Sequence, residues 1–262
     1  MKNKVLFTII IATLFVLISV FTIFSVFIVK HVEVEYSVLK TGAVSADGIQ
    51  NKLSQIKGDN LIFVDTDSVV NSLKEYTYFE VVSCEKSYPN TLKVTLNERI
   101  ARFSVSKGGK KFVISSNGFV LEENADKANS LITLTTATKP SGSIFKISNA
   151  TVGANLAVSH QEIANICYEI INTASLADYV TQVSVYYTGV PGANMLFLHT
   201  YTSAVIVIQD FTVKPIAKAK VAASSYASRD DYHKANYFLY TFEDATSGEI
   251  KVDWSKEQKF GI

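Results

Sequence analysis

The chain is poor in the residues that mark redox, metal-binding and disordered proteins. Its 262 residues include only two cysteines, four prolines and twelve glycines. Cys84 and Cys167 lie far apart and form no CxxC or zinc-ligand spacing, which favours two half-buried free thiols, one on a strand and one on a helix. So little proline and glycine argues against a disordered stalk. The net charge of +1 provides no basic field, and we therefore expect no nucleic-acid partner.

Known signatures of catalysis are missing as well. The sequence contains no G-x-S-x-G nucleophile elbow and no H-E-x-x-H zinc motif, and its four histidines are scattered. The run Lys107-Gly108-Gly109-Lys110 lacks the spacing and the Ser or Thr of a phosphate loop, so it predicts a hairpin turn instead. We expect a non-enzymatic protein with no catalytic residue, no cofactor and no metal site.

The sequence does have one long apolar run. Residues 5–29 contain no charged residue, no glycine and no proline. A bilayer core of about 30 Å needs roughly 20 helical residues, and a cleaved signal peptide would show a shorter apolar run and a small-x-small cleavage site. We therefore expect an uncleaved transmembrane helix over 5–29. Lys2 and Lys4 favour a cytoplasmic tail of residues 1–4 and a single-pass type II topology with the bulk of the chain outside the cytoplasm.

Residues 30–99 predict a small α+β layer. Apolar and polar residues alternate over 31–38 and 91–97, and 79–88 is rich in β-branched and aromatic residues, which indicates three strands. Apolar residues recur at helical spacing over 45–57 and 67–76, with Asp65 and Thr66 as caps for the second helix. The expected order of strand, helix, helix, strand, strand places two helices on one face of a three-stranded sheet.

Residues 100–255 predict a larger domain that mixes strands and helices. A capping box at Ser159 and Glu162 opens an amphipathic helix, and 215–242 is expected to hold one or two helices with a break near 228–231, where Asp230 and Asp231 cap the second. We interpret 123–129 as a polar loop. The expected strands are 103–106, 111–115, 119–122, 131–135, 180–187, 195–200, 204–209 and 249–254.

Three motifs in the first region resemble those of a known family. Thr41-Gly42 through Ile49 resembles the glycine, serine and apolar start of its first helix, and Gly58-Asp59-Asn60-Leu61 through Asp65 resembles its G-x-x-L…D between the helices. The most specific match is Pro89-Asn90-Thr91-Leu92-Lys93-Val94-Thr95-Leu96-Asn97-Glu98-Arg99, which resembles P-x-T-L-x-I-x-V-x-E-R. With the order βααββ just after a single apolar helix, these residues resemble the POTRA domain of the bacterial cell-division family FtsQ/DivIB.

The resemblance implies both an architecture and a function. The expected α+β protein has a tail (1–4), a transmembrane helix (5–29), a POTRA domain (30–99), a mixed α/β "β domain" (100–255) ending in a helix and a strand, and a C-terminal tail (256–262). The implied function is a non-enzymatic divisome scaffold of the cytoplasmic membrane at the division septum. The implied partners are FtsB/DivIC-like and FtsL-like division proteins and septal peptidoglycan synthases.

The final strand is the expected partner-binding site. A sheet edge can accept a partner strand through main-chain hydrogen bonds, and the family is described as recruiting FtsB/DivIC through the last strands of its β domain. A solvated edge strand protected by its own charges is an equal alternative from the residues alone. The expected site residues are Ile250, Lys251, Val252, Asp253 and Trp254, supported by Tyr237 and Phe238 on the preceding helix. Val252 and Trp254 could fill either a partner's pockets or the protein's own core.

Two other functions stay open at this point. A membrane-anchored extracytoplasmic cell-envelope enzyme, or a regulator of one, would need a cluster of converging polar side chains. A POTRA-bearing export component would usually repeat the POTRA domain or continue into a β-barrel, and the sequence indicates neither.

Overall fold

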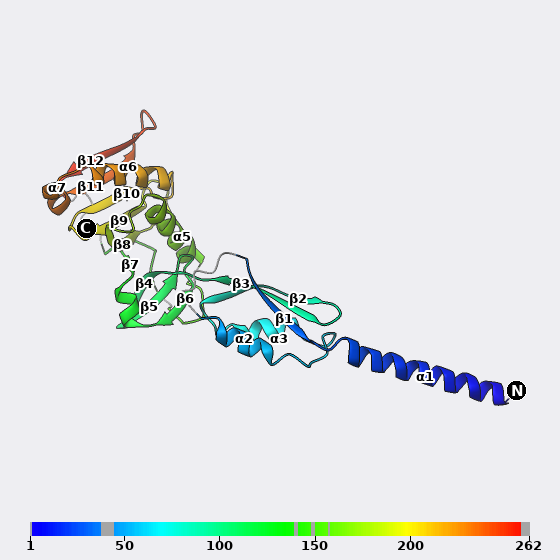
Figure 1. Cartoon of the computed structure of the whole chain (residues 1–262). Helices are drawn as coiled ribbons and strands as arrows, with labels where there is room; N and C mark the ends of the chain where they lie inside the picture. Colours follow the sequence, from blue (N-terminus) through cyan, green and yellow to red (C-terminus); the bar gives the residue numbers. More distant parts are fainter. Residues whose placement is uncertain (1, 38–44, 139–140, 148–149, 157, 258–262) are drawn as a thin grey trace. The chain divides into compact units, whose positions relative to one another are not determined.

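The computed structural model describes residues 2–37, 45–138, 141–147, 150–156 and 158–257. The chain divides into two compact units, Met1–Arg99 and Ile100–Ile262. Figure 1 shows the first unit as a long helix with a small sheet and two helices, and the second as a large sheet with its own helices. The expected mixed α+β fold, with an N-terminal apolar helix, a small sheet and a larger mixed sheet, is confirmed.

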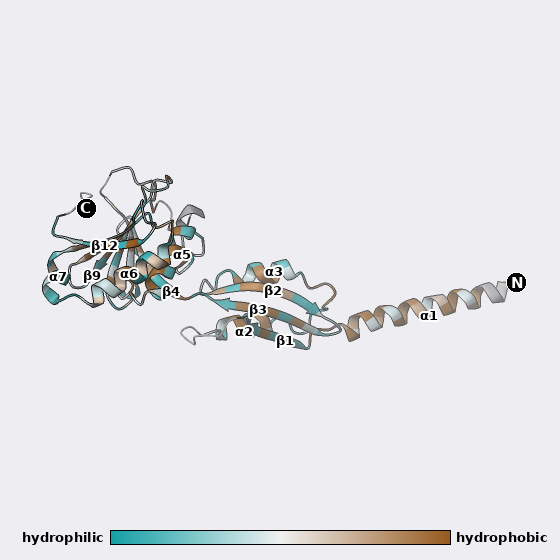
Figure 2. Ribbon diagram, turned by 90° about the horizontal axis from the view of Figure 1, so that it is seen from above, coloured by the Kyte–Doolittle hydropathy of each residue, from teal (hydrophilic) through white to brown (hydrophobic). Residues whose placement is uncertain are grey.

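Helix α1 (Lys2–Val26) is apolar on all sides from Leu6 onward, and Figure 2 draws this part as a pale to brown ribbon. Its segment Leu6–Val26 is long and apolar enough to cross a membrane, and 21 residues at about 1.5 Å each reach about 30 Å. The hydroxyls of Thr13, Ser19 and Thr22 each donate to the carbonyl four residues earlier. These polar groups are therefore satisfied within the helix, as an apolar solvent requires.

The small sheet of the first unit has the predicted βααββ order. Strands β1 (His31–Tyr36), β3 (Thr91–Glu98) and β2 (Phe79–Ser87) lie side by side, with β1 parallel and β2 antiparallel to the central β3. Helices α2 (Asp47–Ser54) and α3 (Thr66–Leu73) pack on this sheet. Val38, the predicted end of the first strand, and the Thr41-Gly42 motif lie outside the described residues.

Alternation decides which face of the small sheet is buried. Leu92, Val94 and Leu96 on β3 are fully buried, and the residues between them are partly exposed. They meet Ile49, Leu53, Val69 and Leu73 of the two helices in one core. The predicted cap is confirmed, since the Asp65 carboxylate accepts a hydrogen bond from the Asp67 N–H at 3.1 Å.

The second unit is built on a nine-stranded mixed sheet. Its order is β12-β11-β10-β9-β8-β7-β4-β5-β6, and the pairs β10/β11, β7/β8 and β4/β7 are parallel while the others are antiparallel. The bounds of the strands are β4 Ala101–Lys107, β5 Lys110–Ser115, β6 Val120–Glu123, β7 Ile132–Thr136, β8 Val180–Tyr186, β9 Met195–Thr200, β10 Val205–Gln209, β11 Phe238–Glu243 and β12 Ile250–Ser255.

Two longer helices cover one face of this sheet. The buried residues of α5 (Val158–Thr173) and α6 (Pro215–Ala227) share a core with the inward-facing residues of the strands. A smaller cluster around Phe197, Val207 and Tyr240 lies on the other face. The Ser159 side chain of the predicted capping box lies outside the described residues.

The hairpin turn predicted at Lys107-Gly108-Gly109-Lys110 is confirmed. Gly108 and Gly109 have φ of +59° and +78° and connect β4 directly to β5, which is the backbone of a two-residue hairpin turn. Gly118, with φ of +79°, precedes β6, which pairs with β5.

Two sequence predictions in the second unit are wrong. The expected loop over 123–129 contains a short helix, α4 (Ala125–Asn129), because the Asn124 side chain accepts a hydrogen bond from the Lys127 N–H and caps it. The helical region expected over 215–242 ends at Asn236 in the structure. It contains α6 and the short α7 (Asp231–Asn236), and then becomes strand β11 at Phe238.

Candidate partner-binding edge

Strand β12 is the terminal strand of the nine-stranded sheet as far as the chain is described. Its residues Ile250–Ser255 pair antiparallel with β11 on one side only. A terminal strand carries one row of backbone N–H and C=O groups that points away from its neighbour. This row, together with the side chains of Ile250–Ser255, is called the β12 edge here.

The two faces of the β12 edge differ in chemistry. Val252 and Trp254 pack against the core that α6 covers, opposite Thr241 and Leu239 of β11. Lys251 and Asp253 alternate with them and therefore lie on the other face. The sequence left open whether Trp254 fills a partner's pocket or the protein's own core. In the structure its side chain is partly buried and packs against the protein's own core.

The indole of Trp254 is held by residues from α6, from α7 and from the turn between them. Its Nε1 donates to Ser225 Oγ at 2.9 Å. The Arg229 guanidinium carbon lies 5.6 Å from the ring centroid, a cation–π distance, and the His233 ring lies edge-on at 6.2 Å. We call Trp254, Ser225, Arg229 and His233 the Trp254 cluster. It fixes the C-terminal half of β12 against the helices.

A second group of rings lies beside the Trp254 cluster. The Lys256 ammonium is 5.3 Å and 5.4 Å from the ring centroids of Tyr232 and Tyr237, and it donates to the Tyr232 hydroxyl at 2.9 Å. That hydrogen bond, followed by attraction to the two phenols, raises the pKa of Lys256. The chain just beyond β12 is thus tied to α7. Asp230 caps this helix as predicted, since its carboxylate accepts a hydrogen bond from the His233 N–H at 2.9 Å.

The turn between β11 and β12 is organised by Asp244. Its carboxylate accepts hydrogen bonds from the N–H groups of Thr246 and Ser247 at 3.0 and 2.9 Å, and from Lys251 Nζ at 2.7 Å. The Lys251 bond is the main reason that the pKa of Asp244 lies well below its usual range, with the two backbone bonds next. Lys251, a predicted partner-binding residue, therefore already holds an intramolecular partner.

The predicted supporting pair does not lie on a helix. Tyr237 follows the last residue of α7, and Phe238 is the first residue of β11, where it pairs with Ser255 of β12. The correction has a physical reason: Phe238-Leu239-Tyr240-Thr241-Phe242 is a β-type aromatic run, and it pairs with a strand on each side. Both residues nevertheless lie beside the predicted strand, Phe238 on the face that carries Asp253.

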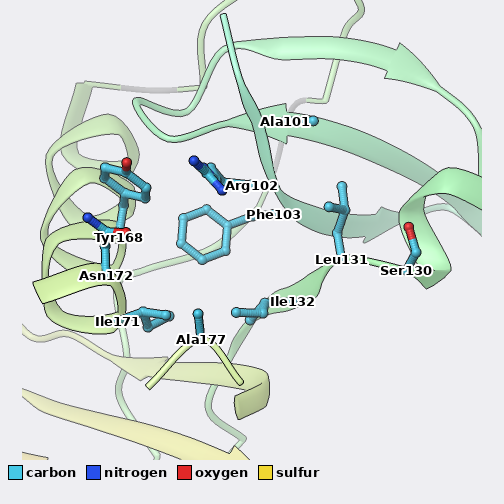
Figure 3. A pocket seen from close by; sticks show the side chains of 10 residues that line it. All are labelled: Ala101, Arg102, Phe103, Ser130, Leu131, Ile132, Tyr168, Ile171, Asn172 and Ala177. Atoms are coloured by element: carbon cyan, nitrogen blue, oxygen red, sulfur yellow. The ribbon is translucent and has the colours of Figure 1, made fainter. Parts of the chain in front are cut away.

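A separate cavity of about 190 Å³ lies between β4, the α4–β7 connection and α5. Figure 3 shows Phe103, Ile132 and Ile171 lining it and Arg102 beside Tyr168, whose ring centroid is 5.5 Å from the guanidinium carbon. Its polar groups are Arg102, Ser130, Tyr168 and Asn172. The residues that line it include no carboxylate and no histidine.

Two titratable side chains of the large domain, Lys218 and Cys167, are buried. Lys218 is 2% exposed, and its ammonium donates to the carbonyls of Gln209 and Asp210 at 2.8 and 2.9 Å, which joins the end of β10 to α6. Burial lowers the pKa of Lys218 and raises that of the Cys167 thiol.

Both cysteines of the chain are free thiols. Cys84 is half-buried on β2, and Cys167 is buried on α5. Among the described residues, no group of three His, Cys, Asp or Glu side chains has a metal-binding arrangement.

Sequence reasoning missed most of the Trp254 cluster. Ser225, Arg229 and His233 lie 21 to 29 positions before Trp254 and meet it only because α6 crosses back over the sheet. The sequence did contain a signal that Lys218 is buried. Lys218 lies on the same helical face as Ala222 and Tyr226, and that face is otherwise apolar.

The fold and a family match together define the class of the first domain. An apolar helix of membrane-spanning length leads into a βααββ layer, and residues 27–99 match the protein family described as "POTRA domain, FtsQ-type". The chain therefore contains an FtsQ-type POTRA domain, which confirms the resemblance found in the sequence.

The particular proteins that the chain resembles are bacterial cell-division proteins. It is a distant homologue of proteins named "Cell division protein DivIB". The relative from Clostridium acetobutylicum is 27% identical over 96 residues, 37% of this chain and 37% of the relative. The relative from Clostridium botulinum is 26% identical over 179 residues, 68% of this chain and 65% of the relative. The matched segments thus cover less than two thirds of these relatives.

Proposed function

We propose that the chain is a non-enzymatic scaffold of bacterial cell division. Helix α1 holds it in the cytoplasmic membrane as a single-pass type II protein with residues 1–4 inside. The POTRA domain (30–99) and the β domain (100–255) lie outside the cytoplasm and gather septal peptidoglycan synthases at the division septum. The FtsQ-type POTRA domain and the DivIB-named relatives support this proposal.

The observation that carries the recruiting role is the outer side of β12. The strand contains no proline and ends the described sheet, so an extended segment of an FtsB/DivIC-like partner, held with an FtsL-like protein, adds to it as a further strand. Main-chain hydrogen bonds would supply the affinity and side-chain fit the specificity.

Each residue of the edge has a role in this proposal. Val252 and Trp254 pack on the α6 side and hold the strand against its own core, and Ile250 shares their face by alternation. Lys251 and Asp253 lie on the opposite face, where charge suppresses indiscriminate strand pairing. Phe238 and Tyr237 border the edge from β11 and its entrance.

A proline in the edge tests strand addition. Val252→Pro removes a backbone donor and fixes φ in the middle of β12. We expect the full chain in detergent to bind the DivIC-like protein of the same genome at least about tenfold more weakly, which corresponds to about 1.4 kcal/mol. Biolayer interferometry with the immobilised partner measures the affinity.

Two controls keep the result specific. Glu123→Pro at the opposite end of the sheet, in β6, should leave the affinity unchanged. Lys251→Ala combined with Asp253→Ala removes side chains but no backbone donor, and should weaken binding less than Val252→Pro. If Val252→Pro retains native affinity while its circular dichroism matches the parent, strand addition at β12 is wrong.

A further inference from the structure

Two loops of the POTRA domain hold the end of α1. Residues 58–64 lie in the connection from α2 to α3, and residues 88–90 connect β2 to β3. The Leu61 N–H donates to the Phe27 carbonyl at 2.6 Å, and the Val29 N–H donates to the Asp59 carbonyl at 2.8 Å. The Lys30 N–H donates to the Asn90 carbonyl of the second loop at 2.9 Å. The chain that leaves the helix is therefore bonded to both loops at once.

The Asn60 side chain extends this junction into the helix itself. Its Nδ2 donates to the Ile23 carbonyl at 2.7 Å. The last carbonyls of a helix have no partner within the helix, and an apolar solvent offers them none. A side chain of the POTRA domain thus satisfies a carbonyl in the last turn of α1.

Two exposed rings of the same loops lie against rings of the helix end. Phe63 and Phe24 have ring centroids 6.2 Å apart, and Tyr88 and Phe27 have centroids 5.8 Å apart. Phe63 is 67% exposed and Tyr88 58% exposed. Phe24 is one of the last apolar residues of the span Leu6–Val26. Wherever Phe24 and Phe27 lie along the membrane normal, Phe63 and Tyr88 lie close to the same depth.

We propose that Phe63 and Tyr88 insert into the interfacial layer of the bilayer at the C-terminal end of α1 and seat the POTRA domain on the membrane. This rests on the proposed crossing of the membrane by α1. The helix of about 30 Å fills the hydrocarbon core, and the interfacial region extends several ångströms beyond it. Aromatic rings with an exposed face are enriched at that level. The occupant of this surface is the lipid itself, because the surface continues that of the helix.

Charge around the two rings does not select a lipid headgroup. Lys30 and Lys57 are exposed there, and Lys86 donates to the Ile62 carbonyl at 2.8 Å. Asp59 and Asp65 belong to the same loop or its end and offset two of these three cations. The insertion should therefore occur in purely zwitterionic phosphatidylcholine vesicles and change little when anionic lipid is added.

Tryptophan fluorescence measures the depth of the loop. In the full chain with Trp254→Phe, the variant Phe63→Trp carries a single indole at the proposed contact. In phosphatidylcholine vesicles its emission should shift to shorter wavelength, and lipids with a nitroxide near the headgroup should quench it. The matched control is Val82→Trp in the same background. Val82 is 52% exposed on β2, about 20 Å of strand from Tyr88, and an indole at this position should escape the quencher.

The outcomes distinguish a failure of this proposal from a failure of the proposed membrane anchor on which it rests. If the chain does not float with vesicles after an alkaline wash, the membrane anchor itself is wrong. If it floats but the indole of the Phe63→Trp variant emits and is quenched like that of the Val82→Trp control, the anchor stands and the seating of the POTRA domain is overturned. If the indole of Phe63→Trp is shielded from aqueous iodide but not quenched by the labelled lipid, protein covers the loop, and the proposed lipid occupant is overturned.

Discussion

The Trp254 cluster gives the sharpest prediction about stability. If Trp254 packs β12 against α6 and is not reserved for a partner protein, then Trp254→Ala must lower the stability of the sheet edge even when no partner is present. A tryptophan packed on one side removes roughly 100–150 Å² from water, worth about 3 kcal/mol at 25 cal/mol per Å². The hydrogen bond to Ser225 adds about 1 kcal/mol.

The expected cost of Trp254→Ala is therefore about 3–4 kcal/mol, which is the ordinary range for deleting a packed tryptophan. For a domain of this size we expect the melting temperature of the β domain to fall by about 10 °C. Trp254→Phe keeps most of the buried area and loses the hydrogen bond, so it should cost only about 1 kcal/mol.

A double-mutant cycle isolates the hydrogen bond. Trp254→Phe and Ser225→Ala should each cost about 1 kcal/mol, and the double variant should cost little more than either alone, because both remove the same bond. Trp254 is the single tryptophan of the chain, so unfolding of the variants is followed by circular dichroism in urea rather than by indole fluorescence. A Trp254→Ala variant with native stability would refute the internal role of the indole and return it to the partner-binding surface.

Three further predictions concern residues away from the edge. Lys218→Met removes two charge-assisted hydrogen bonds at the end of β10 and should cost about 2–4 kcal/mol in urea titrations. Gly118→Ala forces a side chain into a left-handed backbone 3.2 Å from the Gln161 Cα and should cost about 2 kcal/mol, seen as a lower melting temperature. Burial lowers the pKa of His199, which contacts Ser184 at 2.9 Å. Protonation therefore favours the unfolded chain, stability falls as the pH drops through about 6.5, and His199→Gln should flatten the profile between about pH 5 and 7.

Local patterns were sufficient to predict the POTRA domain. The buried residues Leu92, Val94 and Leu96 alternate along a single strand, and their neighbours on the two helices follow helical spacing. Both signals arise within a few residues of sequence, so each element could be predicted from its own segment. The hairpin turn at Gly108 and Gly109 could be predicted for the same reason, because a two-residue turn requires a positive φ at adjacent positions.

Predictions failed where tertiary contacts decide the structure. Tyr237 and Phe238 follow a helical segment, and only pairing with β10 and β12 makes Phe238 the start of a strand. The partners of Trp254 come from α6, α7 and the turn between them, a segment that precedes Trp254 in sequence and returns to the sheet edge. The sequence located the candidate strand almost to the residue, as 249–254 against Ile250–Ser255, but could not tell which of its side chains the protein keeps for itself.

The position of the protein in living cells tests the central proposal most directly. A fluorescent protein fused before residue 1 reports the location of the whole chain in growing cells of its own species without touching β12 or the POTRA loops. We predict a band at mid-cell that forms before constriction and disappears after separation. A uniform signal around the envelope throughout the cell cycle would contradict a role at the division septum.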